Sequence, residues 1–355
     1  MNVDLAARGD VDGTYRRFPD GLPDELLDLP ERELLAALGK PTLIRVPGDG
    51  DAPPRAVACL LHGDESTGFK ALHRILRRRR TYPFDFYAVV GNVRAALEPP
   101  GYAHRFLDDQ EDFNRIWGLD DPTTQARRAA DAMLAALHDA GIESMVDIHN
   151  NTGNNPFYAI VTTLRPETLN LATLWTTTIL HWDLGANTLM EALEDDCAAI
   201  AVECGLPGLP ESLAFAVDGL RRYLGARPLE TDRVRRDFDM LGGLRKVIVK
   251  PEVRFQFGGE LTNEVDFVID EDADVHNFIR VDAGHVIGRV HPGSAMPVRA
   301  IEPGGNDVTD EHFSIRDGEV VLECDVTPVM MTRTVEATRK DCLFYLTNEF
   351  PPPAL

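Results

Sequence analysis

The chain has 355 residues, of which 44% are hydrophobic, and carries a formal net charge of -22 at pH 7. This length and composition suffice for two domains, or for one large α/β domain with an appended unit, around a sizeable core. The strong negative charge argues against binding to nucleic acid or to anionic membranes, because both require a concentrated basic surface.

We expect neither a secretory signal nor a membrane-spanning helix in this sequence. No apolar run approaches the ~20 residues of a membrane-spanning helix, and residues 1–6 lack the basic and apolar regions of a secretory signal. The five cysteines are widely spaced and form no CxxC pair, which argues against a disulfide framework and against a thiolate zinc site. We therefore expect a cytoplasmic protein.

Strand and helix patterns alternate through the first two thirds of the chain. Strands are expected at residues 42–46, 56–61, 84–90, 144–149, 157–161 and 198–203. Helices are expected at residues 31–38, 68–76, 124–140, 165–179 and 212–224. This alternation predicts a largely parallel or mixed sheet with helices on both faces.

The pattern changes near residue 247, where short β-rich stretches are separated by glycine, proline and aspartate. Strands are expected at residues 246–249, 266–269, 285–290 and 319–322. These features predict a compact all-β unit. We therefore expect an α/β domain over residues 1–240 and a C-terminal β domain over residues 245–350.

The turn His62-Gly63-Asp64-Glu65 lies between the buried strand at 56–61 and the helix at 68–76. It stands at the carboxyl end of a strand, where open α/β sheets bind their ligands. A histidine and a carboxylate three residues apart can converge there on one metal ion. Taken alone, the pair has an equally good structural interpretation, with His62 filling the turn and Glu65 favouring the start of the helix.

Two more expected strands end in side chains suited to metal binding or proton transfer, His149 and Glu203. His149 and the His62–Glu65 turn together offer two imidazoles and a carboxylate, which leave a fourth position open, as in catalytic zinc sites. Asp147 is a candidate to orient His149, because alternation along a strand turns both side chains to one face. Glu203 is placed to take a proton from metal-bound water.

Five motifs, in this order, resemble the succinylglutamate desuccinylase/aspartoacylase family, a branch of the zinc carboxypeptidase-like amidohydrolases. They are the His62-Gly63-Asp64-Glu65 turn, Gly91-Asn92-Val93-Arg94-Ala95, Asp112-Phe113-Asn114-Arg115, Asp147-Ile148-His149-Asn150 and Val202-Glu203-Cys204-Gly205. They span about residues 55 to 210. The resemblance implies a zinc carboxypeptidase-like mixed sheet flanked by helices and followed by a small C-terminal all-β domain.

The resemblance also implies a metal centre. One Zn²⁺ per chain would be held by His62, Glu65 and His149, with Glu203 as general base and later as general acid.

The resemblance also implies that three further residues contact the substrate. Asn114 and Arg115 would bind a substrate carboxylate, and Arg105 would polarise the scissile carbonyl. A planar guanidinium suits carboxylate binding, and a second arginine near zinc suits a developing oxyanion. Arg105 stands two residues further from Asp112 than the aspartoacylase pattern has it, so a solvent-exposed loop arginine is the alternative interpretation.

The chain departs from the aspartoacylase pattern in ways that bear on the substrate. No arginine occurs between residues 191 and 202, and no tyrosine occurs between residues 327 and 335. Because a second substrate carboxylate would lack its cation, we expect N-acetyl-aspartate to be a poor substrate. Cys204 has no basic neighbour in sequence, and we interpret it as a small buried residue rather than a nucleophile.

The predicted function is hydrolysis of an amide bond, other than a peptide bond, in a small N-acyl amino acid or related carboxylate. The water would be activated by zinc and Glu203. A zinc carboxypeptidase acting on peptides would use the same residues and is the nearest alternative. A non-catalytic zinc-containing binding protein is the second alternative, and the intact set of metal ligands and Glu203 counts against it. The sequence leaves the oligomeric state open.

Overall fold

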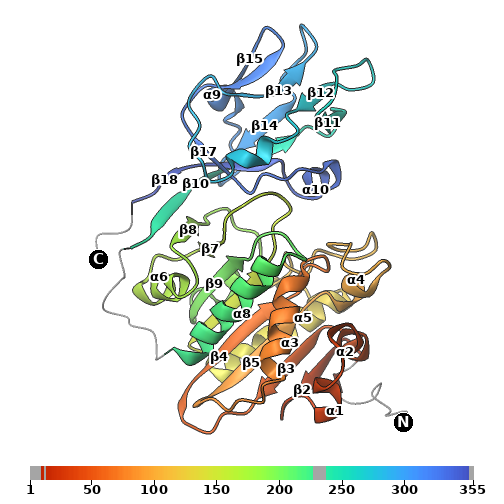
Figure 1. Cartoon of the computed structure of the whole chain (residues 1–355), viewed down its shortest axis with the longest axis vertical. Coiled ribbons are helices and arrows are strands. Elements are labelled where there is room, and N and C mark those ends of the chain that lie inside the picture. Colours follow the sequence, from red (N-terminus) through yellow and green to blue (C-terminus); the bar gives the residue numbers. More distant parts are fainter. Residues whose placement is uncertain (1–8, 12, 227–236, 352–355) are drawn as a thin grey trace.

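The computed structural model describes residues 9–11, 13–226 and 237–351 (Figure 1). The helices are α1 (Asp24–Leu27), α2 (Glu31–Leu38), α3 (Ser66–Leu76), α4 (Val93–Leu97), α5 (Gln125–Ala140), α6 (Pro166–Thr173), α7 (Leu189–Leu193), α8 (Pro210–Gly225), the 3-10 helix η1 (Ala273–His276), α9 (Thr309–His312) and α10 (Val335–Lys340). The strands are β1 (Asp10–Val11), β2 (Tyr15–Phe18), β3 (Thr42–Val46), β4 (Ala52–Cys59), β5 (Phe84–Val90), β6 (Ser144–His149), β7 (Tyr158–Val161), β8 (Thr178–His181), β9 (Ala198–Glu203), β10 (Asp239–Val249), β11 (Phe255–Phe257), β12 (Phe267–Ile269), β13 (Val286–Val290), β14 (Val298–Ile301), β15 (Phe313–Arg316), β16 (Glu319–Leu322), β17 (Thr327–Val329) and β18 (Phe344–Glu349).

A 13-stranded mixed sheet organises the molecule. Its strand order is β1-β2-β3-β5-β4-β6-β9-β7-β8-β10-β18-β17, and β14 pairs with β10 beside this path. The four neighbours β5, β4, β6 and β9 run parallel. Their carboxyl ends therefore meet along one edge, which is where the chain places the candidate site.

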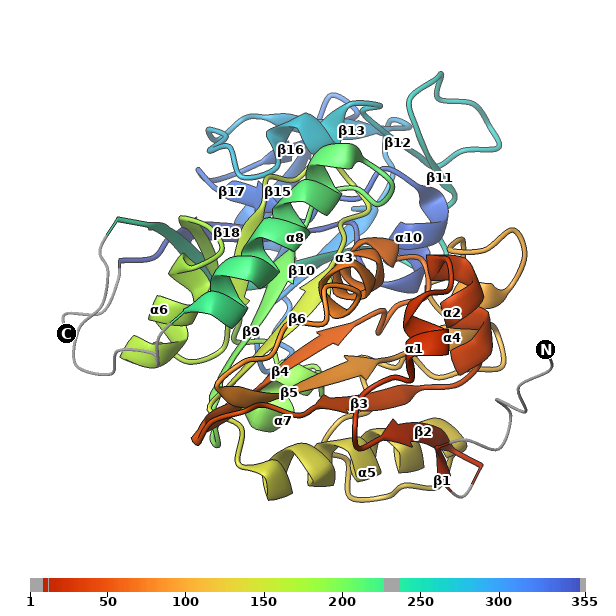
Figure 2. The ribbon, with the colours of Figure 1, turned by 60° about the horizontal axis from the view of Figure 1, so that its bottom comes forward.

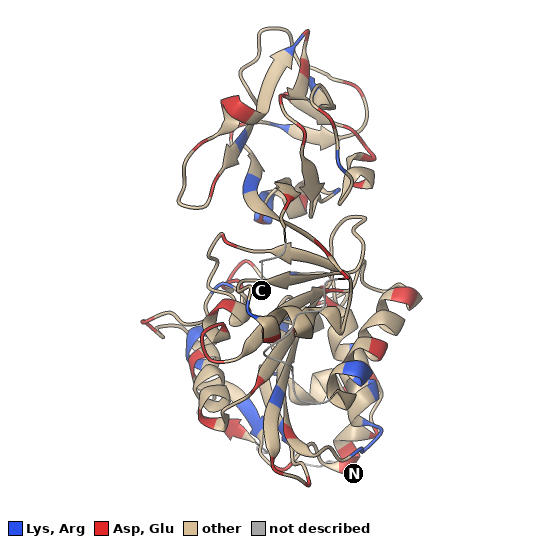
Figure 3. Cartoon of the chain, turned by 90° about the vertical axis from the view of Figure 1, so that its left-hand side faces the viewer, with Lys and Arg blue, Asp and Glu red and all other residues tan. Residues whose placement is uncertain are grey.

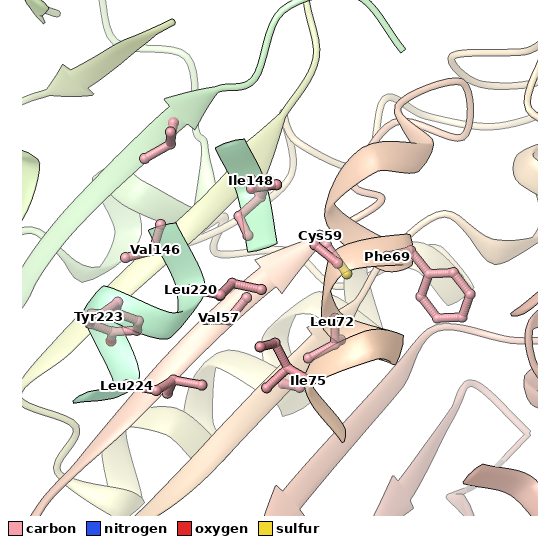
Figure 4. Packing of buried hydrophobic residues seen from close by; sticks show 14 of the residues in the cluster. Val57, Cys59, Phe69, Leu72, Ile75, Val146, Ile148, Leu220, Tyr223 and Leu224 are labelled. Atoms are coloured by element: carbon pink, nitrogen blue, oxygen red, sulfur yellow. The ribbon is translucent and has the colours of Figure 1, made fainter. Parts of the chain in front are cut away.

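Helices cover both faces of this sheet, as the alternation of elements predicts (Figure 2). On one face α3 and α8 pack on Val57 and Cys59 of β4 and on Val146 and Ile148 of β6 (Figure 4). On the other face α5 and α7 pack on small or apolar side chains that alternate with these, such as Ala58. Because both faces are buried, the central strands are almost continuously hydrophobic. The predicted mixed α/β architecture is confirmed.

Most predicted elements match the structure within a few residues, but the helix predicted over residues 165–179 is wrong in its second half. Helix α6 ends at Thr173, and β8 begins at Thr178. The sequence Thr176-Thr177-Thr178-Ile179, which leads into β8, consists only of β-branched residues, which are stiff in a helix and pack well in a sheet. The short helices α4 and α7 were not predicted.

The C-terminal part contains a second, five-stranded sheet of order β11-β12-β13-β16-β15, in agreement with the predicted small β domain. However, β10, β14, β17 and β18 extend the large sheet. The predicted boundary between residues 240 and 245 thus falls inside β10, so the division into two domains stays a prediction.

Acidic residues occur in both the α/β part and the C-terminal part of the chain (Figure 3). Among residues 9–11, 13–226 and 237–351, no helix is both long and apolar enough to cross a membrane.

Candidate metal centre and active site

The turn after β4 is fixed by close packing. Leu60 has a φ of 58°, in the left-handed region, and turns the chain from the strand toward His62. A side chain at Gly63 would place its Cβ 2.6 Å from Ala95 Cβ, and one at Gly68 would place its Cβ 2.8 Å from Cys59 Cβ. Both positions therefore require glycine, because the turn lies against α4 and the start of α3 lies against β4.

The turn brings His62 and Glu65 to His149, the last residue of β6. Glu65 Oε1 lies 2.7 Å from His62 Nδ1, and Glu65 Oε2 lies 2.7 Å from His149 Nδ1. One ligand atom from each of the three residues lies within 4.8 Å of the other two, and all three residues are buried. Across the described part of the chain, no other group of histidine, cysteine or acidic residues meets this criterion.

Each histidine also faces a second carboxylate through its other ring nitrogen. His62 Nε2 lies 3.1 Å from Asp112 Oδ1, and His149 Nε2 lies 2.7 Å from Asp147 Oδ2. This arrangement is typical of metal-binding histidines, whose outer nitrogen donates to a carboxylate that fixes the ring and its tautomer. Asp147 therefore has the orienting position that strand alternation predicts for it. The same position for Asp112 was not predicted.

The carboxylates and histidines of this group stabilise one another's charged forms. Burial opposes ionisation of Glu65, yet the two histidines hold the pKa of Glu65 well below its usual range. Burial likewise opposes the charge on His149, but Asp147 and Glu65 raise the pKa of that imidazole well above its usual value. Three carboxylates, Glu65, Asp112 and Asp147, thus surround the two imidazole rings.

Glu203 ends β9 and is paired in register with His149 of β6, so the two side chains point to the same face of the sheet. The Glu203 side chain is buried, and its Oε2 has no hydrogen-bond partner. Burial raises the pKa of Glu203 to about 7, and Glu65 adds to this rise while His149 opposes it. A carboxyl group of this kind is suited to exchange protons near neutral pH.

A cavity of about 370 Å³ opens beside this group. Its lining contains every residue that the sequence predicts for the site, namely His62, Glu65, Arg105, Asn114, Arg115, His149 and Glu203. Five of the lining residues carry a buried polar atom without a partner, namely Asp64, Asp147, Asn151, Glu203 and Thr332. Unpartnered buried polar atoms are rare in native proteins, so their concentration here indicates a ligand-binding cavity.

Arg105 lies inside the site, not in a solvent-exposed loop position. Its Nε donates to Asp112 Oδ2 over 3.2 Å, and its Nη1 lies 3.7 Å from Glu65 Oε1. Although burial disfavours its charge, Asp112 and other carboxylates keep the pKa of Arg105 above its usual value. A permanent positive charge therefore stands beside Glu65, one of the three candidate metal ligands.

Asn114 and Arg115 lie next to each other in the lining but have different surroundings. Asn114 is buried, its Oδ1 accepts from the Leu189 backbone over 3.1 Å, and its Nδ2 lies 3.2 Å from His149 Nε2. The Arg115 side chain is 32% exposed, and its Nη2 lies 3.8 Å from Asp341 Oδ2. Arg115 is therefore the more accessible anchor for an anion.

Sequence reasoning missed several lining residues, among them Asn151, Asp341 and Tyr345. Asn151 Oδ1 accepts from Tyr158 Oη over 3.1 Å, which leaves its buried Nδ2 as an unpartnered donor. Asp341 accepts from Lys246 Nζ over 2.9 Å, and Tyr345 lies on β18. Asn151 follows the Asp147–Asn150 motif directly, a signal available in the sequence. The other two come from a distant segment, and Tyr345 lies beyond the stretch 327–335 in which a tyrosine was expected.

Cys204 is fully buried and is not part of the cavity lining. Burial raises the pKa of its thiol well above the usual value, and Glu203 and Glu65 add to that rise. A protonated thiol in this position is a poor nucleophile, which agrees with its interpretation as a small buried residue.

The carboxylate of Asp147 should matter for metal affinity. Asp147→Asn keeps the size of the side chain but removes the charge that orients His149, so we expect zinc affinity to fall by about 10-fold to 100-fold. Competition with a chromogenic chelator measures this affinity. Asp218→Asn, an exposed change on α8, serves as the control. Equal affinities in the two variants would show that Asp147 does not support the metal centre.

No family model matches the sequence, and no curated protein matches it in sequence. Solved structures do resemble it. The succinylglutamate desuccinylase from Chromobacterium violaceum has a TM-score of 0.54 at 13% identity, over 88% of this chain and 89% of that one. The succinylglutamate desuccinylase/aspartoacylase from Rhodobacter sphaeroides has a TM-score of 0.53 at 15% identity, over 86% and 88%. The product-bound ectoine utilization protein EutE (DoeB) from Ruegeria pomeroyi has a TM-score of 0.51 at 16% identity, over 87% and 84%.

Many of the structural neighbours are succinylglutamate desuccinylase/aspartoacylase family proteins, and all of those above have low sequence identity to this chain. The resemblance stated from the sequence is thus confirmed at the level of the fold. The buried His62, Glu65 and His149 are compatible with a metal site in this fold.

Proposed function

We propose that the protein is a zinc-dependent amidohydrolase that cleaves the amide bond of a small N-acyl amino acid or related carboxylate. One observation carries this proposal. Three buried side chains with zinc-type donors converge beside Glu203, whose buried Oε2 is unpartnered, in a cavity large enough for a small substrate.

The donor set fits zinc better than the hard cations. Two imidazole nitrogens and one carboxylate are the ligands of catalytic zinc sites, whereas Ca²⁺ and Mg²⁺ prefer oxygen ligands alone. His62, Glu65 and His149 would hold the ion. When bound, zinc would supply Lewis-acid polarisation of the scissile carbonyl and increased acidity of a coordinated water.

Glu203 would move the proton. Its carboxylate accepts a proton from the attacking water as the water oxygen forms a bond to the carbonyl carbon. The same carboxyl then donates that proton to the amide nitrogen as the carbon–nitrogen bond breaks, so the amine leaves in neutral form. The raised pKa of Glu203 suits both halves of this transfer.

The two arginines would bind different groups of the substrate. Arg105, beside Glu65, stabilises negative charge that develops on the carbonyl oxygen. Arg115 binds the substrate carboxylate through its planar guanidinium, next to Asn114.

The charges of the lining favour a substrate with a single carboxylate. Of the three Arg and Lys side chains that line the cavity, Arg115 is the most loosely paired, with Asp341 at 3.8 Å, and it is assigned to the first substrate carboxylate. The other two are more closely paired within the protein, since Arg105 lies 3.2 Å from Asp112 and Lys340 lies 3.0 Å from Glu336. A second substrate carboxylate would thus be buried without a free cation, which costs several kcal/mol.

We therefore expect N-acetyl-aspartate to be a poor substrate compared with neutral N-acetyl amino acids, by tenfold or more in kcat/KM. The measurement compares these substrates on the zinc-loaded enzyme, with matched dipeptides assayed alongside. If N-acetyl-aspartate or succinylglutamate is preferred by tenfold, a cation outside this lining completes the pocket. Faster cleavage of the dipeptides would instead indicate a carboxypeptidase.

A further inference from the structure

The cavity contains a group of uncharged side chains that the chemistry above does not use. This apolar subsite consists of Ile160, Trp182, Met190, Ala201, Cys342 and Tyr345. Each of the six is at most 7% exposed, yet all line the cavity. We propose that the apolar subsite receives a large uncharged side chain on the amino-acid half of the substrate.

Ala201 and Ile160 form the floor of the apolar subsite, and the sheet places them next to the metal-binding group. Ala201 lies two residues before Glu203 on β9, so both side chains point to the same face. Ala201 is paired in register with Asp147 on one side and with Ile160 of β7 on the other. Because adjacent strands lie about 4.8 Å apart, Ala201 and Ile160 stand one and two strand spacings from β6, which carries His149.

The walls of the apolar subsite are formed mainly by the apolar parts of aromatic and aliphatic side chains. The rings of Trp182 and Tyr345 lie 5.5 Å apart, centroid to centroid, at an angle of 64°. The indole Nε1 of Trp182 donates to Glu191 Oε1 over 3.0 Å, so its polar edge has a partner within the protein. Met190, from α7, adds a flexible apolar side chain that adapts to varied shapes.

The carboxylate anchor contacts the two segments that carry these walls. Asn114 accepts from the backbone of Leu189, the neighbour of Met190. Arg115 faces Asp341, the neighbour of Cys342. When Arg115 binds the substrate carboxylate, the substrate side chain on the neighbouring α-carbon therefore lies beside the apolar subsite. The acyl group then lies away from it.

The expected consequence is that kcat/KM rises with the size of the apolar side chain on the amino-acid half of the substrate. One methylene more or less in a hydrophobic pocket changes kcat/KM by about 10-fold or more. We expect N-acetyl-leucine to exceed N-acetyl-glycine in kcat/KM by ~10-fold or more on this basis.

Ala201→Leu tests the floor of the apolar subsite directly, because it fills the space that a substrate side chain would occupy. It should lower the ratio of kcat/KM for N-acetyl-leucine to that for N-acetyl-glycine by ~10-fold or more. Ala337→Leu, the same change on α10 elsewhere in the lining, is the matched control and should leave the ratio unchanged. Met190→Gln, which keeps the length of the side chain and makes the wall polar, is a second test that does not overpack the sheet.

The catalytic assay rests on the proposed function, so a binding assay accompanies it. The shift in melting temperature of the unaltered protein is measured with L-leucine, glycine and L-aspartate at equal concentrations. A larger shift with L-leucine supports the inference even if no N-acyl amino acid is hydrolysed, and that result would count only against the proposed function. The inference is overturned, while the proposed function stands, if hydrolysis occurs but kcat/KM is about equal for N-acetyl-leucine and N-acetyl-glycine. The same holds if the ratio of these two values is unchanged in both Ala201→Leu and Met190→Gln.

Discussion

Replacing His149 by alanine is expected to remove both the bound metal and the hydrolase activity. The substitution leaves Glu65 and His62 as the remaining ligands, and two ligands do not form the three-residue catalytic zinc site. Zinc content measured by atomic absorption should fall from about one per chain to near zero. Activity should fall to the background rate, and His62→Ala should have the same effect.

His138→Ala is the matched control, because His138 is exposed on α5 and its Nδ1 lies 3.2 Å from Asp196 Oδ2 at the surface. The variants should be compared by circular dichroism, since removing His149 leaves Glu65 and Asp147 buried without their shared partner. A folded His149→Ala protein with full zinc content would show that His149 is not a ligand.

Glu203→Gln is expected to have the second-largest effect, and it separates chemistry from metal binding. The amide keeps the shape of the side chain but cannot take up the proton of the attacking water. We expect zinc content to stay near one per chain while kcat falls by ~100-fold or more.

The control for Glu203→Gln is Glu211→Gln, an exposed change in the first turn of α8. If Glu203→Gln lost its metal but kept its rate per bound zinc, Glu203 would be a structural residue of the metal centre. If Glu203→Gln kept both its metal and its kcat, another group would act as the base.

The part of the site that lies at strand ends could be predicted from the sequence. His62, His149 and Glu203 each follow a buried apolar run, and parallel strands bring their carboxyl ends to one edge. Alternation along β6 was sufficient to place Asp147 on the same face as His149. These inferences need only local periodicity and the geometry of a parallel sheet.

The remaining wall of the cavity could not be predicted, because it depends on long-range packing. Asp341 and Tyr345 come from a segment that follows the second sheet, and they reach the site because β18 pairs with β10 in the large sheet. Trp182 was assigned to no element, and the first half of the strand β8 before it was predicted as the end of a helix. Local sequence patterns carry no information about which distant strand becomes a neighbour.

The central claim is that a zinc ion at His62, Glu65 and His149 is required for amide hydrolysis. The most direct test measures zinc content and hydrolysis of a neutral N-acetyl amino acid in the same sample, before chelation, after chelation and after zinc is restored. We predict about one zinc per chain, loss of activity with the metal, and recovery of both together. Full hydrolysis by the metal-free protein would contradict the account.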